Sequence, residues 1–478
     1  MKKNNTTRSI IALLISQIVV KCLGLLYKLY LANKKGFGDV GNAIYNSGYQ
    51  IYALLLTIST IGVPNVISKL IAENKNKNRA VEEITKNAFA LFSIIGIFGC
   101  LFLIISSKFI ANDLLNIPEA RLSIIALSPA IFNVCIISVM RGYYNGINKI
   151  ETTAKSQTIE QFIKTISTIM FVEIYYLINS SNVANIAAIA NFATTIATLG
   201  CLIYLWKKKV NGIGYGNIST KKMFEIIKLT VPISLSAILA SLNRNIDSIT
   251  VVRYMKRFVG ESFAKKELGL MSGKIDVIAS VPVSFIVAIS TTIIPNIAKN
   301  KNNIKYIRNI SYKYFKLLGI IIIPCSILLY TCAGKILFLL FGSDNGKVLL
   351  QINAISLLFI SAEQIINAIL HGLGCIYTPA ISLTIGVCIK AILNILFLNF
   401  DSKIFWFGGI VGCSIATLTC HFVAFAIVFI KLLKKLKIKW KIFLFFVETN
   451  NCFVYNGLEL EIEINCNSNL ENIDKFYR

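Results

Sequence analysis

The sequence predicts an all-α integral membrane protein of about twelve transmembrane helices, arranged as two six-helix lobes related by a parallel pseudo-twofold axis. Three observations lead to this prediction. The 478 residues are 55% apolar and only 15% charged, whereas a soluble chain carries roughly 25% charged residues. Long apolar segments recur along the chain, and the second half of the chain repeats features of the first.

Each apolar segment is close to the ~20 residues that a helix needs to cross a bilayer. Backbone amides within hydrocarbon must be hydrogen-bonded inside their own segment, so these segments are expected to be helices and not open strands. The twelve spans are expected near residues 9–31, 43–71, 87–107, 122–144, 157–178, 183–206, 226–251, 273–297, 309–332, 347–371, 379–400 and 404–430.

The formal charge of +26 first suggests nucleic-acid binding, but the positions of the basic residues argue against it. They gather in alternate gaps between spans, as in Lys75–Lys86, Lys207–Lys222 and Lys431–Lys441, apart from one basic loop near 253–274. This bias predicts a multi-pass protein of the cytoplasmic membrane with both termini in the cytoplasm. The charge then orients the helices and meets anionic membrane lipids, and no nucleic-acid partner is expected.

An internal repeat predicts how the spans are grouped. Ile58-Ser59-Thr60 followed by Pro64 returns as Ile289-Ser290-Thr291 followed by Pro295, and Ala154 and Lys164 return as Ala380 and Lys390. Six is an even number, so both halves enter the membrane from the same side and the repeat is parallel. The expected organisation is an N-terminal lobe (1–206), a cytoplasmic linker (207–222), a C-terminal lobe (223–430) and a basic juxtamembrane segment with a polar tail (431–478).

Ionisable residues inside several spans are candidate functional groups, because each costs about 3 kcal/mol at the centre of a membrane helix and normally faces a cavity or a partner. Steps of four, three and four residues place the polar groups of the first span on one helical face, and the seventh span repeats these steps. The residues are Gln17, Lys21, Gly24 and Lys28 in the first span, and Ser236, Ala240, Asn243 and Asp247, with Arg244 beside them, in the seventh. Arg244 and Asp247 are close enough to pair within their helix. A cavity with several cations and few acids favours an anionic substrate group such as a pyrophosphate.

Other polar and kink-forming residues complete the prediction. Glu160 and Lys164 have the i,i+4 spacing of a pair within the fifth span, and Lys390 lies near the middle of the eleventh. Arg141 lies at the cytoplasmic end of the fourth span. Pro64 and Pro295 are expected to bend their helices.

No enzymatic centre is predicted. The twelve cysteines contain no C-x-x-C pair, the two histidines have no nearby carboxylate spacing typical of a metal site, and there is no phosphate-binding loop of the G-x-x-x-x-G-K-[ST] kind. We therefore expect no catalytic residues, no metal, no cofactor and no direct drive by ATP.

Several motifs resemble one family of membrane transporters. They are Lys21-Cys-Leu-Gly24-Leu-Leu-Tyr27, Ile58-Ser-Thr-Ile-Gly62-Val-Pro64 and Arg141-Gly-Tyr-Tyr-Asn-Gly146, the last leading to Ile159-Glu160-Gln161. The chain is similar over roughly 8–430 to the stage V sporulation protein B and polysaccharide-transporter branch of the multidrug/oligosaccharidyl-lipid/polysaccharide flippase superfamily. The resemblance implies a MATE-like, V-shaped pair of lobes that moves lipid-linked saccharides, including peptidoglycan precursors on undecaprenyl pyrophosphate, across the cytoplasmic membrane.

The resemblance also implies roles for individual residues. It implies that the pyrophosphate headgroup is bound by Lys21, Lys28, Arg244 and Arg141. Members of the family generally have fourteen spans where this sequence predicts twelve, so its polar tail is expected to be either a disordered cytoplasmic end or the product of a truncation or frameshift.

Two other functions stay open at this point. A cation-coupled multidrug exporter on the same fold would be indicated by an unpaired acid in the cavity. A membrane saccharide polymerase or ligase would need a large external loop with catalytic residues, whereas the longest external loop here, near 252–272, is basic and lacks histidine. The preferred hypothesis is alternating-access transport of a polyprenyl-pyrophosphate saccharide, with an unassigned driving ion.

Overall fold

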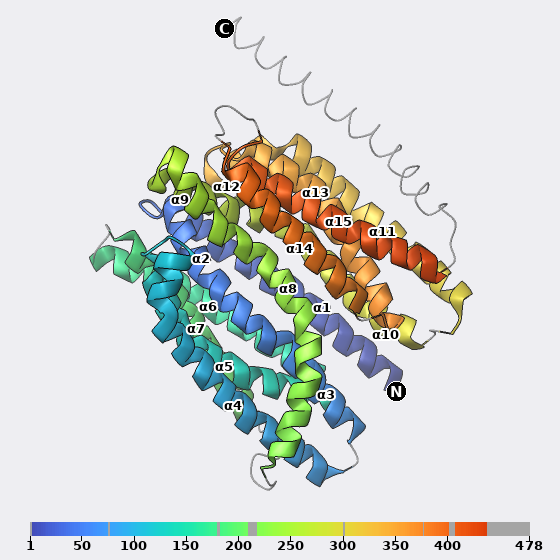
Figure 1. Cartoon of the computed structure of the whole chain (residues 1–478). Coiled ribbons are helices and arrows are strands. Elements are labelled where there is room, and N and C mark those ends of the chain that lie inside the picture. Colours follow the sequence, from blue (N-terminus) through green and yellow to red (C-terminus); the bar gives the residue numbers. More distant parts are fainter. Residues whose placement is uncertain are drawn as a thin grey trace, which may run out of the picture. The chain divides into compact units, whose positions relative to one another are not determined.

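The structure is a computed structural model, which describes residues 2–74, 77–178, 182–208, 218–299, 302–375, 377–400 and 407–436. Every regular element in these ranges is helical (Figure 1). The helices are α1 (Lys2–Asn33), α2 (Gly38–Thr57), η1 (Ile58–Gly62), α3 (Val63–Glu73), α4 (Asn78–Phe109), η2 (Ile110–Leu114), α5 (Ala120–Gly146), α6 (Ile150–Ile178), α7 (Val183–Lys207), α8 (Thr220–Val259), α9 (Glu261–Leu270), η3 (Met271–Ile275), α10 (Asp276–Lys299), α11 (Ile304–Thr331), α12 (Ala333–Phe341), α13 (Lys347–Gly372), α14 (Tyr377–Leu398) and α15 (Ile410–Leu436).

Most of the predicted spans coincide with these helices. Among the described residues, nine helical segments are long and apolar enough to cross a membrane. The other three predicted spans fall on α1, on the run from α2 through η1 to α3, and on α8, which is 40 residues long. Most of the predicted linker and nearly all of the predicted polar tail lie outside the described residues.

The helices form two compact units. The first comprises Met1–Ile278 and Val387–Ala416, and the second comprises Ala279–Gly386 and Thr417–Arg478 in their described parts. In the first unit, α5 packs against α4 and α7, and α6 packs against α1 and α7. In the second unit, α11 and α12 pack against α13. These units follow packing contacts, and the lobe boundaries expected from the repeat stay a prediction.

One helix–helix contact occurs in both units and supports the repeat. A Cβ atom added to Gly142 of α5 would lie 2.9 Å from Cβ of Ile67 on α3. A Cβ atom added to Gly372 of α13 would lie 2.8 Å from Cβ of Ile297 on α10. Both residues of the second contact lie 230 residues after their counterparts. The glycine allows the same close approach of two helices in each unit.

The two proline positions expected to bend helices differ in local structure. Pro64 lies in the first turn of α3, directly after the π-helical turn η1. Proline has no N–H to donate to the preceding turn. The missing backbone hydrogen bond is consistent with the wider π-helical turn that precedes α3. Pro295 lies within α10, whose helical assignment continues to Lys299.

Close packing of α9 and η3 on α2 depends on two glycines. A Cβ atom at Gly269 would overlap the carbonyl oxygen of Asp39, and one at Gly273 would lie 2.7 Å from Cβ of Asn42. The four-residue spacing places both glycines on one helical face. Small residues of this kind let membrane helices approach closely.

We expect Gly269→Ala to destabilise the protein by about 1–3 kcal/mol, because the added methyl group meets backbone and not a movable side chain. The measurement is the temperature at which the detergent-solubilised protein loses its monodisperse peak in size-exclusion chromatography. Gly24→Ala is the matched control, since its Cβ atom would meet only Gln161 Nε2 at an ordinary 3.6 Å. Equal melting temperatures for the two variants would contradict the packing described here.

Candidate functional site

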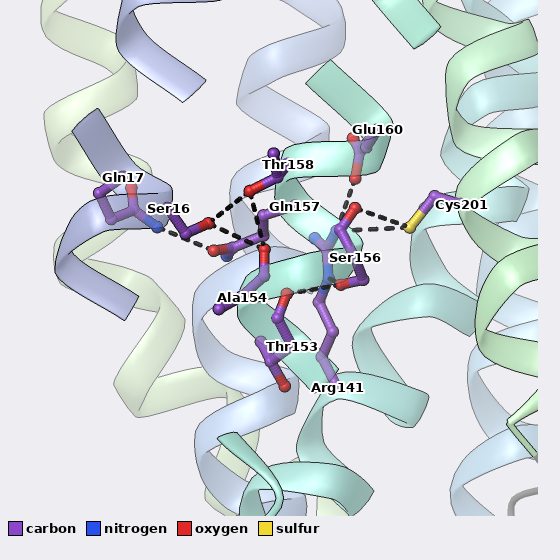
Figure 2. A network of polar contacts seen from close by, with 10 residues as sticks. All are labelled: Ser16, Gln17, Arg141, Thr153, Ala154, Ser156, Gln157, Thr158, Glu160 and Cys201. Carbon is purple, nitrogen blue, oxygen red and sulfur yellow. Dashed lines mark hydrogen bonds and ion pairs between the residues drawn. The ribbon is translucent and has the colours of Figure 1, made fainter. Parts of the chain in front are cut away.

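The first helix is joined to α6 by polar contacts near its middle. Ser16 Oγ donates to the carbonyl oxygen of Ala154 at 2.8 Å, and Gln17 Nε2 donates to Gln157 Oε1 at 2.8 Å (Figure 2). Gln17, expected to line a cavity, therefore takes part in a contact between two helices. Lys21, one turn further along α1, is exposed, and Lys28 is half-buried.

Arg141 lies in a buried network between α5, α6 and α7. Its Nε donates to Ser156 Oγ at 2.9 Å and its Nη2 donates to Glu160 Oε2 at 2.6 Å, while Cys201 Sγ lies 3.5 Å from Nη2 (Figure 2). The Arg141 side chain is only 11% exposed. Charge-assisted bonds from a planar guanidinium fix both partners in orientation. The predicted i,i+4 pair of Glu160 with Lys164 does not form, because Glu160 pairs with Arg141 on the neighbouring helix.

Lys164 is buried among aromatic rings. The residue is 5% exposed, and its Nζ lies 4.2 Å from the ring centroid of Tyr49 and 5.2 Å from that of Tyr27. The negative faces of aromatic rings attract an ammonium group, and this attraction is strongest where water is excluded. The spacing of Tyr45 and Tyr49 places both rings on one face of α2. This aromatic face is the sequence feature that could have indicated the contact.

Lys390 makes the corresponding buried contact on α14. Its Nζ lies 2.7 Å from Asp247 Oδ2 and donates to the carbonyl oxygen of Asn243 at 2.8 Å. Asn394 Nδ2 donates to the second oxygen of Asp247 at 2.8 Å. The predicted pair of Asp247 with Arg244 is therefore wrong, since Asp247 pairs with Lys390. Lys164 and Lys390, which the repeat makes equivalent, are both buried lysines.

Three cations of α1 and α8 have no such buried partner among the described residues: Lys21 and Arg244 are exposed and Lys28 is half-buried. The charge of Arg244 lies within electrostatic range of both lysines, and Asp276 lies within range of Lys28. We call Lys21, Lys28 and Arg244 the cation cluster. Because its members are close and of one sign, the cluster favours an anionic ligand.

Two ion pairs that the sequence did not reveal lie where α9 and η3 pack on the first helices. Lys274 Nζ lies 2.8 Å from Asp39 Oδ1, with both side chains at most 10% exposed. Lys265 Nζ lies 2.7 Å from Glu119 Oε1. The glycine spacing of Gly269 and Gly273 was a signal for the helix contact but not for the ion pairs, whose partners lie more than 140 residues apart.

The chain is similar in sequence to two curated proteins of Bacillus subtilis. A curated relative, the lipid II flippase MurJ of Bacillus subtilis, is 24% identical over 418 residues, which cover 81% of this chain and 76% of the relative. Stage V sporulation protein B of Bacillus subtilis is 22% identical over 433 residues, covering 88% of this chain and 82% of the relative.

Solved structures have the same fold. A lipid II flippase MurJ in an inward closed conformation matches with a TM-score of 0.74 at 16% identity, covering 96% of this chain and 93% of that protein. An inward-facing multidrug resistance MATE family transporter of the MOP superfamily matches with a TM-score of 0.73 at 12% identity, covering 90% of this chain and 98% of that protein. These likenesses confirm the expected MATE-like fold.

The family itself follows from a model match to more than half of the chain. Residues 6–301 match the model described as polysaccharide biosynthesis protein. The matched region contains the cation cluster, the Arg141 network and the contact of α9 with α2. The chain belongs to the polysaccharide biosynthesis protein family.

Proposed function

We propose that this protein is a flippase that moves a polyprenyl-pyrophosphate saccharide across the cytoplasmic membrane by alternating access, without covalent chemistry. The observation that carries the proposal is the cation cluster, in which Lys21, Lys28 and Arg244 present positive charge from helices expected to span the membrane. Positive side chains at this depth need a partner, and a mobile anionic headgroup is a partner that a transporter can bind and release. The name of one curated relative, a lipid II flippase, supports the same class of substrate.

The structure changes the proposed role of Arg141. Arg141 is bound to Glu160 and Ser156, so its charge is already balanced inside the protein. We propose that it holds α5, α6 and α7 together and that the headgroup contacts belong to the cation cluster. The predicted orientation, with both termini in the cytoplasm, and the two rocking lobes are parts of the same proposal.

A multidrug exporter on the same fold is the second candidate, favoured by the match to solved MATE family transporters. Such a protein needs an acid available for a cationic drug. Five acids lie within the predicted spans. Glu160, Glu173 and Asp247 are in ion pairs with Arg141, Lys34 and Lys390, Glu363 lies beside His421, and Asp276 lies within electrostatic range of Lys28. The three ion pairs support an anionic substrate in preference to a cationic one.

The test is protein-dependent movement of a fluorescent pyrophosphoryl-lipid saccharide in liposomes, read as protection from an external quencher. We expect the wild-type protein to accelerate this movement and Lys21→Ala/Arg244→Ala to slow it at least about tenfold, because each lost charge-assisted contact is worth about 1.5–3 kcal/mol and 1.4 kcal/mol is a tenfold change.

Two comparisons make this test specific. Lys69→Ala is the matched control, since Lys69 is an exposed lysine of α3 paired with Glu73 at 3.9 Å and lies outside the cluster. A cationic dye carried in the same assay distinguishes the multidrug function. Equal saccharide rates with and without protein would remove the flippase assignment.

A further inference from the structure

We infer that Lys164 is a further residue that binds the pyrophosphate, and that its ammonium exchanges two tyrosine rings for a phosphate oxygen when the substrate binds. The inference rests on the proposed function, because it concerns the same substrate as the cation cluster. It adds a third helix, α6, to the headgroup site, and it gives the buried position of Lys164 a role in binding.

The ammonium of Lys164 is buried without an oxygen acceptor in the described part of the chain. The residue is 5% exposed, and its Nζ faces the rings of Tyr49 and Tyr27 at 4.2 and 5.2 Å from their centroids. An ammonium group has three N–H donors. The buried ammonium of Lys390 directs its donors at oxygen, including Asp247 Oδ2 at 2.7 Å. Lys164 therefore lacks the oxygen partner that its equivalent in the second half of the chain has.

Lys164 lies beside the part of α1 that carries the cation cluster. Its neighbour Thr165 donates through Oγ1 to the carbonyl oxygen of Leu23 at 3.2 Å, which joins this turn of α6 to α1. Tyr27, whose ring the ammonium faces, directly precedes Lys28 in the sequence. Lys164 is also within electrostatic range of Lys28. An anion bound at Lys28 would therefore be close to the ammonium of Lys164.

The second ring connects Lys164 to the cluster residue of α8. Tyr49 is within electrostatic range of Arg244. Ser248, one helical turn after Arg244, donates to Gln50 Oε1 at 2.5 Å, and Gln50 follows Tyr49 on α2. The turn of α8 that carries Arg244 thus lies beside the turn of α2 that carries Tyr49. The two tyrosines around Lys164 are next to both helices that carry the cation cluster, and all four helices belong to the first unit.

The charges in this region favour a ligand with two negative groups. Lys28 is influenced most by three cations, Lys164, Arg244 and Lys21, and by one acid, Asp276. A pyrophosphate that links a lipid to a saccharide carries one negative charge on each of its two phosphates. Several cations on different helices can contact such a group at the same time, and lysine binds phosphate as a point charge.

Glu160 does not compete for the ammonium. It lies one turn before Lys164 on α6, but its carboxylate is bound by Arg141 at 2.6 Å. The remaining attraction between Lys164 and the rings depends on their quadrupoles and is moderate. A charge-assisted hydrogen bond to a phosphate oxygen is stronger than a neutral one. The flexible four-carbon stem of lysine lets Nζ turn toward the phosphate while α6 stays in place.

The test measures binding and not transport. A fluorescent pyrophosphoryl-lipid saccharide is titrated with the detergent-solubilised full chain and followed by fluorescence anisotropy, with the same lipid as a free alcohol for comparison. We expect Lys164→Met to weaken binding of the pyrophosphoryl lipid at least about tenfold, because one charge-assisted contact is lost. Lys164→Arg, which keeps a cation for both rings and phosphate, is expected to stay within about threefold of wild type. Lys69→Met is the matched control on an exposed lysine outside the site.

A variant of the ring separates the exchange of partners from a role in packing. We expect Tyr49→Leu to bind the pyrophosphoryl lipid about threefold more tightly, because it removes a contact that the ammonium must give up on binding. If Lys164 only supported the packing of α6, both Lys164→Met and Tyr49→Leu would weaken binding. Unchanged or weaker binding by monodisperse Tyr49→Leu would overturn the exchange, whether or not Lys164→Met can be purified.

The outcomes also separate this inference from the proposed function. Wild-type binding of the pyrophosphoryl lipid in preference to the alcohol, with equal affinity in monodisperse Lys164→Met, would overturn the role of Lys164 and leave the flippase proposal standing. A wild-type protein that does not distinguish the pyrophosphoryl lipid from the alcohol would overturn both.

Discussion

Lys390→Met is expected to destabilise the protein by about 3–5 kcal/mol, the loss typical of removing one partner of a buried ion pair. Lys390 is 1% exposed and its Nζ lies 2.7 Å from Asp247 Oδ2. Methionine fills a similar volume but leaves the Asp247 carboxylate buried without a cation. The measurement is the apparent melting temperature of the detergent-solubilised protein, followed by loss of the monodisperse peak.

The double variant Lys390→Met/Asp247→Leu separates the charge effect from lost packing. Replacing both members of a buried ion pair with apolar residues is often neutral or stabilising, so we expect the double variant to recover most of the lost stability. A double variant as unstable as the single one would show that Lys390 acts through packing and not through its charge.

The fold could be predicted from the sequence because membrane helices obey local rules. Span length, apolar content and the distribution of lysines and arginines are properties of single segments, and they place α5, α7, α13 and α14 within two residues of their observed bounds. The repeat was visible for the same reason. Pairs such as Ala154 and Ala380 keep their sequence identity, and the packing contacts of Gly142 and Gly372 repeat with nearly the same offset.

The partners of the buried charges could not be predicted in this way. Helical spacing proposed Glu160 with Lys164 and Arg244 with Asp247, but a pair on one helix surface stabilises by only about 0.2–0.5 kcal/mol. A partner on another helix, where water is excluded, interacts far more strongly. Arg141 and Lys390 provide such partners for the two acids. Their selection depends on how the helices pack, which the spacing along one helix does not encode.

The same argument explains the residues that sequence reasoning undervalued. The contact of Tyr27 and Tyr49 with Lys164 becomes visible only when α6 brings the lysine against their rings. His421 read as a packed polar group until α13 brings Glu363 beside it. In both cases one residue type was noticed and its neighbour on a different helix was not.

A disulfide between α2 and η3 is expected to stop transport completely and reversibly. In the proposed mechanism α2 belongs to the first lobe and η3 to the second, so their contact must open when the lobes rock. Asn42→Cys/Gly273→Cys provides the bond, because a Cβ atom at Gly273 would lie 2.7 Å from Cβ of Asn42 and a disulfide needs about 3.8 Å between Cβ atoms. A small relaxation of the helices suffices. We expect oxidation to reduce saccharide movement to the rate of protein-free liposomes and a reductant to restore it.

The matched control is a disulfide within one proposed lobe. Ile67→Cys/Gly142→Cys joins α3 to α5, where the corresponding Cβ atoms would lie 2.9 Å apart, and both helices move together if the lobes rock as bodies. We expect this oxidised variant to transport at the rate of its reduced form. Continued transport by the oxidised α2–η3 variant, with the disulfide verified by mass spectrometry, would show that the buried ion pair of Asp39 with Lys274 belongs to a contact that never opens. The moving parts of the cycle would then have to lie elsewhere in the helices.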